Sequence, residues 1–351
     1  MTLRQTISFC RSSDGTRIAV ASCGRGPVIL RAAHWLSHCY HDVESPIWRP
    51  WLAAFSARHR FVRYDPRGCG LSDRMVSDLS FDAWQSDLEA VAATIDAPRL
   101  VLLGLSQGGA LAIRFALAHP ERVSHLVLVN AYAQGARTRA RTESERLEAE
   151  TLVNFVRIGW GRENPAFCQF FTNLFIPDGT AEQHLWWGDL ERLTATADVA
   201  ARLLHEMQGI DVTLEAQRLT VPTLILHCRN DMRVPFEEGR KLAAMVPGAR
   251  FVPLDSGNHV LLPEEPAWGM LHQEIARFLS GDLEDVPALR NARLTPAETV
   301  ILGLVAEGLS NRAIAAKLGK SEKTVRNQLS FIFTKLGVHN RAQAIVMALA
   351  G

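Results

Sequence analysis

The chain has 351 residues, of which 47% are hydrophobic and 21% are charged, and its formal net charge at pH 7 is +1. This composition excludes a collagen-like, largely disordered or disulfide-rich protein, and the length predicts two or three domains. A net charge near zero argues against a nucleic-acid partner only if the charges are spread evenly along the chain.

The six cysteines lie far apart in the sequence, and none forms a C-x-x-C pair. We therefore expect no metal site, no disulfide framework and no other bound cofactor, and this cysteine usage fits a reducing compartment. The first residues place Arg4, Arg11 and Asp14 among apolar ones, which is unlike a secretory signal peptide. Because no run of about 18 apolar residues occurs, we expect a cytoplasmic protein without a membrane partner.

The first 131 residues alternate short apolar runs with longer amphipathic segments. Residues 3–10 and 16–22 flank a turn at Asp14-Gly15, a pattern typical of a β-hairpin. The alternation that follows predicts a mostly parallel sheet covered on both faces by helices. The expected strands are 27–32, 60–64, 98–104 and 123–131, and the expected helices are about 47–57, 80–96 and 107–118.

The alternation stops between about 132 and 215, where an Arg- and Glu-rich stretch is followed by an aromatic-rich one. We interpret this segment as a helical insertion, after which strands at 221–228 and 249–254 alternate with helices at 236–246 and about 265–280. The polar segment after Ser280 is typical of a linker. The expected domains are therefore an α/β unit over 1–280, a linker over 281–292 and a helical module over 293–351.

A G-x-S-x-G motif, Gly104-Leu105-Ser106-Gln107-Gly108, lies between an expected buried strand and an expected helix. In this context the motif is typical of a nucleophile elbow, a turn so tight that the residues beside the serine must be small. A glycine-rich strand–helix turn without catalytic function is the alternative. The placement directly after a buried strand favours the elbow.

Two more residues follow expected strands: Asp231 lies just past 221–228, and His259 lies just past 249–254. Open α/β sheets place their sites at these carboxyl ends. In the order Ser106, Asp231, His259, the serine would attack a carbonyl, the histidine would carry its proton, and the aspartate would hold the imidazole tautomer. Alone, Asp231 could be a turn residue and His259 an ordinary loop histidine.

Together with this triad, two further motifs make the chain resemble the α/β-hydrolase family. Asp65-Pro66-Arg67-Gly68-Cys69-Gly70-Leu71-Ser72 is similar to the D-x-R-G-x-G-x-S turn of that family, and Val221-Pro222-Thr223 through Pro235 is similar to its acid-bearing strand and loop. The resemblance covers residues 1–280. It implies a mostly parallel sheet with a helical cap, the cap being the insertion at about 132–215.

The loop that should carry half of the oxyanion hole departs from the family pattern. Family members usually have His-Gly there, whereas this chain has Ala33-His34-Trp35. By position, the resemblance implies that the backbone N–H groups of Trp35 and Gln107 form the hole, and loss of one such donor costs about 10²–10³-fold in rate.

The resemblance also places a ligand pocket between cap and sheet, where we expect a small apolar ligand with a carbonyl group. Most of the cap aromatics would merely pack the cap onto the core. The tryptophans expected at the pocket are Trp35, Trp160, Trp186 and Trp187.

The charge is not spread evenly. Residues 293–351 contain eight Lys and Arg against three acidic residues, a net charge of +5, which leaves −4 for residues 1–292. A basic module attached to a mildly acidic body is the electrostatic pattern of a nucleic-acid binder.

In this module, residues that typically begin and end helices predict an all-α domain of four helices. Thr295-Pro296-Ala297-Glu298 begins the first helix, which ends at Gly308, and Ser310 begins the second, which ends at Gly319. Ser321 caps a third helix that ends at Gly337, and Asn340 begins the fourth. A short turn followed by a basic helix predicts a helix-turn-helix domain.

The string Gly308-Leu309-Ser310-Asn311-Arg312-Ala313-Ile314-Ala315, with 320–326 and 335–338, resembles the LuxR/NarL-type DNA-binding domain over about 293–350. The resemblance implies that the third helix enters the major groove of double-stranded DNA and that two copies form a homodimer on a two-fold site. For some lysines the alternative is an ordinary solvated charge. The residues expected at DNA are Arg312, Lys320, Ser321, Lys323, Thr324, Arg326, Asn327, Lys335 and Arg341.

Two hypotheses of function follow from this combination. The first is a transcriptional regulator whose α/β-hydrolase domain binds a small ligand at the Ser-Asp-His site, either without turnover or with hydrolysis of that ligand. The second is an active esterase or lactonase with an accessory DNA-binding domain. An adaptor in which both sites are silent has little support, because both sets of key residues are present.

Overall fold

The computed structural model describes residues 3–162, 165–280, 295–306, 309–322, 324–326, 328–329 and 332. The chain divides into two compact units, Met1–Leu279 and Ser280–Gly351, and each is described by itself.

The first unit is built on an eight-stranded sheet whose strand order is β1-β2-β4-β3-β5-β6-β7-β8. The hairpin strands β1 and β2 are antiparallel to each other, and β2 is antiparallel to β4, whereas all later neighbours are parallel. The central strands are apolar runs buried on both faces, as expected for parallel strands under two helical layers. Their bounds are β1 Gln5–Arg11, β2 Arg17–Cys23, β3 Val28–Arg31, β4 Arg60–Tyr64, β5 Leu100–Leu105, β6 Val123–Val129, β7 Thr223–Cys228 and β8 Arg250–Leu254.

Helices cover both faces of this sheet. On one face α1 and α11 are in contact, because the Trp51 indole N–H donates to the carbonyl of Leu261 (3.0 Å) and its ring meets Trp268 edge to face. On the other face α2 packs on α3, α3 on α9 and α9 on α10. The bounds are α1 Trp48–Ser56, α2 Phe81–Ala93, α3 Gln107–Ala118, α9 Thr213–Gln217, α10 Phe236–Met245 and α11 Pro266–Ser280.

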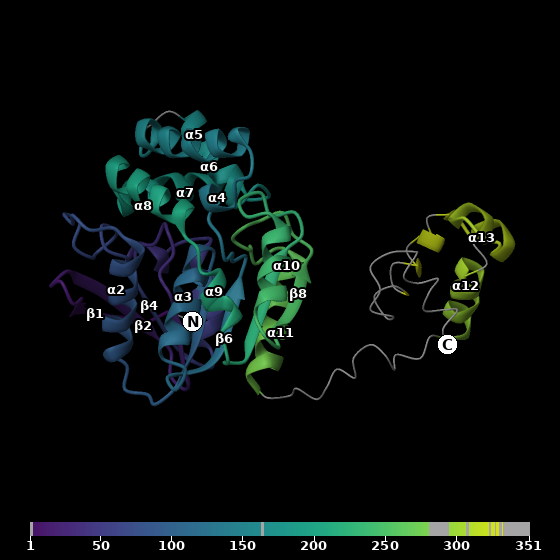
Figure 1. Ribbon diagram of the computed structural model, residues 1–351, viewed down its shortest axis with the longest axis horizontal. Coiled ribbons are helices and arrows are strands. Elements are labelled where there is room, and N and C mark those ends of the chain that lie inside the picture. The colour runs from purple at the N-terminus through teal and green to yellow at the C-terminus, as the bar shows by residue number, and fades with distance from the viewer. Residues whose placement is uncertain are drawn as a thin grey trace. The chain divides into compact units, whose positions relative to one another are not determined.

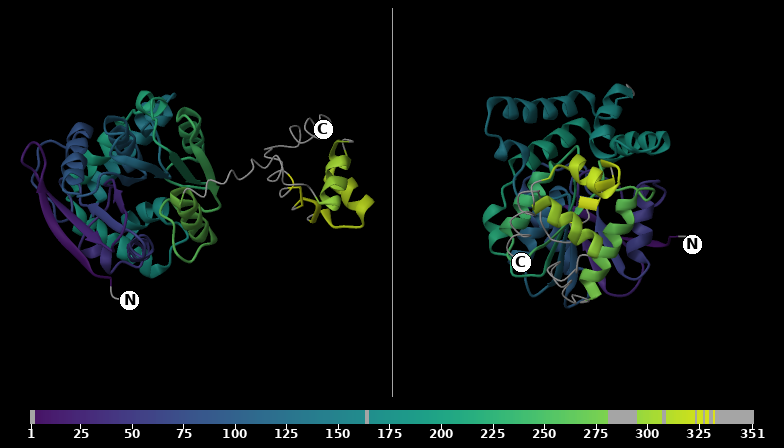
Figure 2. Two further views of the ribbon diagram at one scale, coloured as in Figure 1. Left: turned by 90° about the horizontal axis from the view of Figure 1, so that it is seen from below. Right: turned by 90° about the vertical axis from the view of Figure 1, so that its right-hand side faces the viewer.

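The insertion between β6 and β7 forms a helical cap, which Figures 1 and 2 show gathered at one end of the sheet. The strands beneath it end in the predicted elbow and triad loops, so the cap covers the carboxyl ends of the sheet. This arrangement confirms the predicted mostly parallel sheet with a helical cap. The cap helices are α4 Ala136–Arg139, α5 Glu143–Gly159, α6 Pro165–Phe175, α7 Ala181–Thr194 and α8 Ala197–Gly209.

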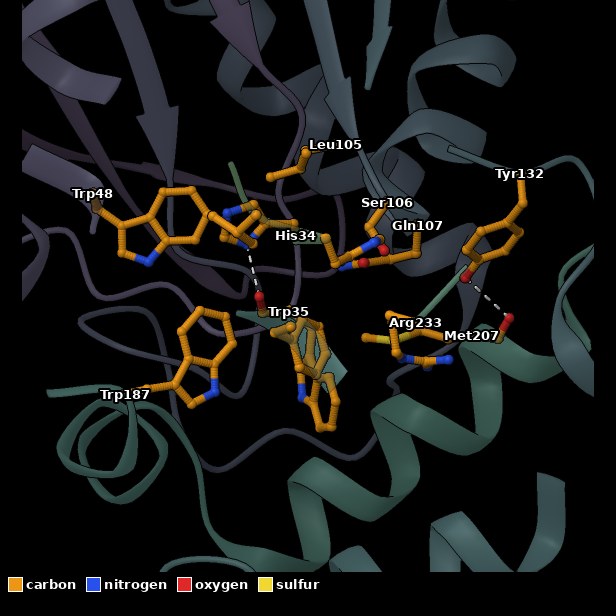
Figure 3. Close-up of a pocket in the computed structure, with 13 residues that line it drawn as sticks. His34, Trp35, Trp48, Leu105, Ser106, Gln107, Tyr132, Trp187, Met207 and Arg233 are labelled. Carbon is orange, nitrogen blue, oxygen red and sulfur yellow. Dashed lines mark hydrogen bonds between the residues drawn. The ribbon is translucent and has the colours of Figure 1, made fainter. Parts of the chain in front are cut away.

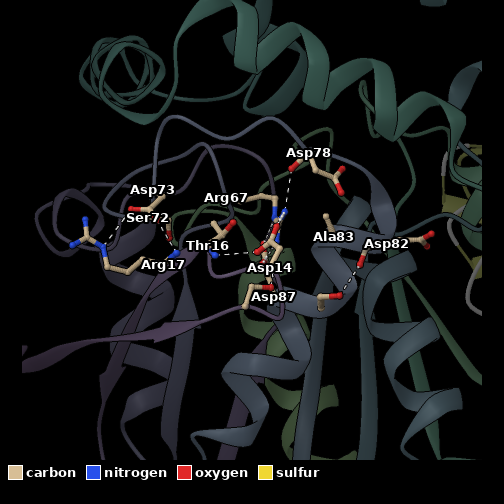
Figure 4. Close-up of polar contacts among 12 residues, drawn as sticks. Asp14, Thr16, Arg17, Arg67, Ser72, Asp73, Asp78, Asp82, Ala83 and Asp87 are labelled. Atoms are coloured by element: carbon tan, nitrogen blue, oxygen red, sulfur yellow. Dashed lines mark hydrogen bonds and ion pairs between the residues drawn. The ribbon is translucent and has the colours of Figure 1, made fainter.

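The turn after β4 is held by buried charges (Figure 4). The Arg67 guanidinium donates to both carboxylate oxygens of Asp87 at 2.8 and 2.7 Å and to Asp14 at 2.8 Å, so the buried cation is fully compensated. Asp65 lies in the same turn and accepts from the Ser37 hydroxyl and the Leu71 amide, both at 2.9 Å. A Cβ on Gly70 would lie 2.2 Å from Asp65 Oδ2, so only glycine fits there.

In the second unit, the regular elements among the described residues are all helices. Helix α12 spans Pro296–Ala306 and α13 spans Asn311–Leu318, and residues 322, 324–326, 328–329 and 332 are also helical. A small separate core is buried between them, formed by Ile301, Leu302, Leu304, Val305, Ile314, Ala315, Val325, Leu329 and Ile332. The predicted fourth helix lies outside the described residues.

Caps begin both helices and end α13 where the sequence predicts, and the predicted end of the first helix at Gly308 lies outside the described residues. Thr295 and Glu298 exchange hydrogen bonds in a capping box, with the Thr295 amide 2.8 Å from the Glu298 carboxylate. The Ser310 hydroxyl accepts from the Ala313 amide at 3.3 Å, and α13 ends at Gly319 in the left-handed region, with φ of 61°.

Candidate active site

Ser106 stands on the turn between β5 and α3. Its backbone has φ of 55° and ψ of −127°, a combination that ordinary residues avoid, and its N–H donates to the Val129 carbonyl at 3.0 Å. The turn closes only because its neighbours are glycines: a Cβ on Gly104 would lie 2.6 Å from the Gly109 Cα, and one on Gly108 would lie 2.9 Å from the Ala33 carbonyl. This is the geometry of a nucleophile elbow.

His259 and Asp231 are joined by a short hydrogen bond between Nδ1 and Oδ2, at 2.7 Å, and both side chains are buried. The other oxygen of Asp231 accepts from the amides of Arg233 (2.8 Å) and Val234 (3.0 Å), which fixes the carboxylate. Because a carboxylate only accepts, His259 carries its proton on Nδ1. In the neutral ring Nε2 then presents a lone pair, and this buried atom has no partner among the described residues.

Two segments outside the triad hold the main chain of His259. The Asn130 side chain, which follows β6, donates to the His259 carbonyl at 2.7 Å and accepts from the Cys228 amide at 2.7 Å. The Phe175 carbonyl, at the end of cap helix α6, accepts from the amides of His259 (2.8 Å) and Val260 (3.1 Å). The histidine loop is thus attached to both the sheet and the cap.

Ser106 and His259 line one cavity below the cap, which together with the open solvent at its mouth has a volume of ≈ 380 Å³ (Figure 3). Its walls are mostly aromatic and come from the sheet loops, the cap and the loop after β7. Among the described residues, Ser106 Oγ makes no hydrogen bond to His259, and in empty sites such contacts are often long. The other lining residues are His34, Trp35, Trp48, Leu105, Gln107, Tyr132, Phe175, Trp187, Met207, Arg233 and Val260.

The four tryptophans expected at the pocket take different places. Trp35 and Trp187 line the cavity, whereas Trp160 and Trp186 are not among its lining residues. Trp160 stacks on Trp35 with ring centroids 5.0 Å apart and donates to the Ala195 carbonyl. Trp186 stacks on His41 at 4.7 Å. Trp160 supports the wall from behind, because the packing of the cap turns its indole away from the ligand space.

The two predicted oxyanion donors come from different segments: the Trp35 amide lies on the loop after β3, and the Gln107 amide lies at the start of α3. Within the described part of the chain, neither the Trp35 amide nor the Gln107 amide donates to a backbone carbonyl. His34, which stands where the family usually has glycine, packs its ring on Trp48 at 4.6 Å and lies 2.7 Å from the Trp35 carbonyl through Nδ1. Burial, together with the charge of Arg31, lowers the pKa of His34 well below its usual range, so the ring is neutral. Its Nδ1 donates, which leaves the buried Nε2 as an acceptor at the cavity.

Reasoning from the sequence missed several lining residues, chiefly Tyr132, Phe175, Met207 and Arg233. Of these, Arg233 had a usable signal, since it lies two residues past the predicted acid on the same loop. Phe175 belongs to the aromatic stretch of the cap, but nothing in the sequence distinguishes it from the aromatics around it. Met207 lies in α8 and reaches the cavity only through the packing of the cap on the sheet.

In the second unit, the described residues expected at DNA lie on its surface. Arg312, Lys320 and Arg326 are exposed, and the Thr324 amide donates to the Ser321 hydroxyl at 3.1 Å, which caps the helix that follows. Arg326 also forms an exposed ion pair with Glu322 at 3.4 Å. Four expected DNA-contacting residues lie outside the described residues: Lys323, Asn327, Lys335 and Arg341.

The described residues contain neither a metal-binding cluster nor a membrane-spanning helix. No group of three or more His, Cys, Asp or Glu side chains there is arranged to hold a metal ion. No helix in that part of the chain has the length and apolar character needed to cross a membrane.

Comparison with known proteins assigns both units. Residues 37–266 match the model of the alpha/beta hydrolase fold family, and residues 292–348 match that of "Bacterial regulatory proteins, luxR family". One relative is the "Putative carbamate hydrolase RutD" of Pseudomonas savastanoi pv. phaseolicola, 28% identical over 62% of this chain and 82% of that protein. Another is the AB hydrolase superfamily protein YisY of Bacillus subtilis, 27% identical over 59% of this chain and 76% of that protein.

Solved structures share the fold of the first unit. An esterase from Exiguobacterium antarcticum superposes with a TM-score of 0.65 at 21% identity, covering 78% of this chain and 99% of its own. An enol-lactonase from Burkholderia xenovorans gives a TM-score of 0.63 at 21% identity, covering 78% of this chain and 100% of its own. The chain therefore belongs to the alpha/beta hydrolase fold family and carries a C-terminal domain of the LuxR family of bacterial regulatory proteins.

Proposed function

We propose that the chain is a DNA-binding transcriptional regulator whose hydrolase unit binds a small apolar ligand with a carbonyl group. The observation that carries the proposal is the cavity itself: it brings Ser106 and the free Nε2 of His259 together under aromatic walls, in a chain whose other domain is of the LuxR family. A ligand enclosed there would have its carbonyl beside the nucleophile and its apolar part against Trp35 and Trp187.

The second candidate is turnover by the same residues, as in an esterase or lactonase with an accessory DNA-binding domain. The hydrogen bond from His259 to Asp231 favours it, because the histidine is already in the tautomer of a general base. Ser106 Oγ would attack the carbonyl carbon while its proton passes to Nε2, and the amides of Trp35 and Gln107 would hold the developing oxyanion. Nε2 would return the proton to the leaving oxygen, and water would then release the acid.

Hydrolysis of an activated short-chain ester tests the catalytic part. We expect the wild-type chain to hydrolyse p-nitrophenyl butyrate and Ser106→Ala to lose at least about 10³-fold in kcat/KM. Ser124→Ala, a half-buried serine on β6 away from the cavity, is the matched control and should keep the rate. Equal rates in the wild type and Ser106→Ala would remove the catalytic claim and leave a binding-only pocket.

Salt-dependent DNA binding tests the regulatory part. Fluorescence anisotropy on a labelled duplex should show an affinity that falls steeply as salt rises, because bound cations release counterions from DNA. Arg326→Ala should weaken binding about fivefold and reduce the slope of log K against log salt by about 0.9. Arg240→Ala, an exposed arginine of the hydrolase unit, is the control. Salt-independent binding, or no binding, would contradict the proposal.

A further inference from the structure

Arg233 is a half-buried cation at the mouth of the cavity, and its guanidinium pairs with no carboxylate among the described residues. Its backbone N–H donates to Asp231, and its guanidinium lies 6.0 Å from the centroid of the Phe175 ring. Within the described part of the chain, that guanidinium has no carboxylate or carbonyl as acceptor. Arg67, by contrast, is compensated by Asp87 and Asp14.

Arg233 lies between two spaces. It lines the catalytic cavity, where Figure 3 shows it beside Met207 and at the opposite end from Trp48. It also lines an outer groove of ≈ 1030 Å³ between α5, α6 and the loop after β7. The groove has two charged lining residues, Glu148 and Arg233, and only Arg233 is shared with the cavity. The guanidinium is therefore the charged group that both spaces share.

The surroundings of Arg233 leave its charge uncompensated. Burial lowers the pKa of the guanidinium, and repulsion from Arg139 adds to this effect, while Tyr132 and Asp231 oppose it. Tyr132 cannot supply the counter-charge, because burial raises the pKa of its hydroxyl to about 12. Asp231 is already engaged by His259 and two amides. A partly desolvated guanidinium without an anion is costly, and a bound anion would relieve that cost.

We infer that Arg233 binds the carboxylate of a ligand whose acyl carbonyl lies at Ser106. The ligand class is thus an ester or lactone with an apolar part and one free carboxylate. A singly charged group is favoured because His34 is neutral, so Arg233 is the one permanent cation among the described residues that line the cavity. A phosphate would leave a second negative charge among aromatic rings. The inference rests on the proposed function of the same cavity and names its substrate class.

Binding to the full chain carrying Ser106→Ala tests this assignment without turnover. The probes are the monoethyl esters of succinate, glutarate and adipate, each compared by calorimetry with the neutral primary amide of the same shape. A charge-assisted, partly buried hydrogen bond corresponds to about 10- to 100-fold in affinity. We expect at least one acid to bind tighter than its amide by this factor, and monoethyl phosphate to bind more weakly than that acid.

Substitutions locate the effect. Arg233→Gln keeps the backbone N–H that donates to Asp231, and it should reduce the preference for the acid ligand over the amide ligand to within about threefold. Arg233→Lys should retain part of that preference. Arg229→Gln is the matched control, since Arg229 is exposed on the same loop and does not line the cavity. Thermal unfolding of each variant checks that the fold is kept.

The outcomes separate the two proposals. Equal binding of acid and amide, an unchanged preference in Arg233→Gln, loss of the preference in Arg229→Gln, or no acid bound up to about 10 mM would each overturn the role of Arg233. Ester hydrolysis that depends on Ser106 but shows no acid preference would retain the proposed function and reject this inference. If the wild-type chain hydrolyses no ester but prefers the acid in a way that requires Arg233, the role of Arg233 is retained and the catalytic proposal is rejected.

Discussion

The cavity at Ser106 and the surface of the C-terminal helices use charge in opposite ways. In the cavity the polar groups are few and enclosed: the Asp231 and His259 side chains are 0% and 1% exposed. On the helices the cations stand in water, and the Arg326 side chain is 68% exposed. Enclosure makes each interaction strong and each loss large, whereas exposed charges act weakly and add up. Single substitutions should therefore have large effects in the first region and graded effects in the second.

Asp231→Asn should give the largest effect and would sharpen this contrast most. The amide would no longer hold the His259 tautomer with Nε2 free, and turnover of an activated ester should fall by about 10⁴-fold. The measurement is kcat for wild type and variant under identical conditions. Asp255→Asn, an exposed residue on the histidine loop, is the control and should keep the rate. A loss below tenfold in Asp231→Asn would mean that enclosure contributes little here.

Glu191→Gln should reveal a buried carboxyl group whose ionisation costs stability. Burial raises the pKa of Glu191 to about 8, from an ordinary value of 4.5, so the folded chain holds a proton that the unfolded chain releases. The stability gained from that proton is complete below pH 4.5 and is lost as the pH rises toward 8. Gln cannot ionise, so the variant should be more stable than the wild type by about 3 kcal/mol at pH 7.

Denaturant unfolding at pH 4.5 and pH 7 measures the Glu191 effect, and the gain should nearly vanish at the lower pH. Glu182→Gln, exposed on the same helix α7, should change stability by less than about 0.5 kcal/mol at both values. A gain of equal size at the two pH values would point to packing rather than ionisation.

Ser310→Ala should have the smallest effect and tests the exposed side of the comparison. The hydroxyl caps α13 by accepting from the Ala313 amide, and loss of such a cap costs about 1 kcal/mol. Hydrogen exchange at the α13 amides should accelerate about fivefold, while exchange in the hydrolase unit stays unchanged. Ser310→Asp keeps an acceptor at the cap and should restore protection. A tenfold or larger acceleration of exchange in Ser310→Ala, or no restored protection in Ser310→Asp, would contradict the expectation that exposed groups contribute weakly.

Much of the fold could be predicted because its signals are local. Buried parallel strands are continuous apolar runs, so β5, β6 and β7 lie within two residues of their expected bounds. The elbow at Ser106 could also be predicted, because a side chain on its flanking glycines would clash with the adjacent backbone. Which cap aromatics face the ligand could not be predicted. Trp160 and Trp187 differ only in how the cap helices pack on the sheet, and that depends on contacts between distant segments.

The end of α6 has a consequence for how the molecule opens. A carbonyl in the last turn of a helix usually accepts from water or from residues just after the helix. The Phe175 carbonyl instead accepts from the amides of His259 and Val260. The final turn of this cap helix and the histidine loop thus complete each other's hydrogen bonding. They form one cooperative unit for local unfolding, although the chain places them far apart. Any fluctuation that exposes the His259 amide to solvent exchange must also release the end of α6.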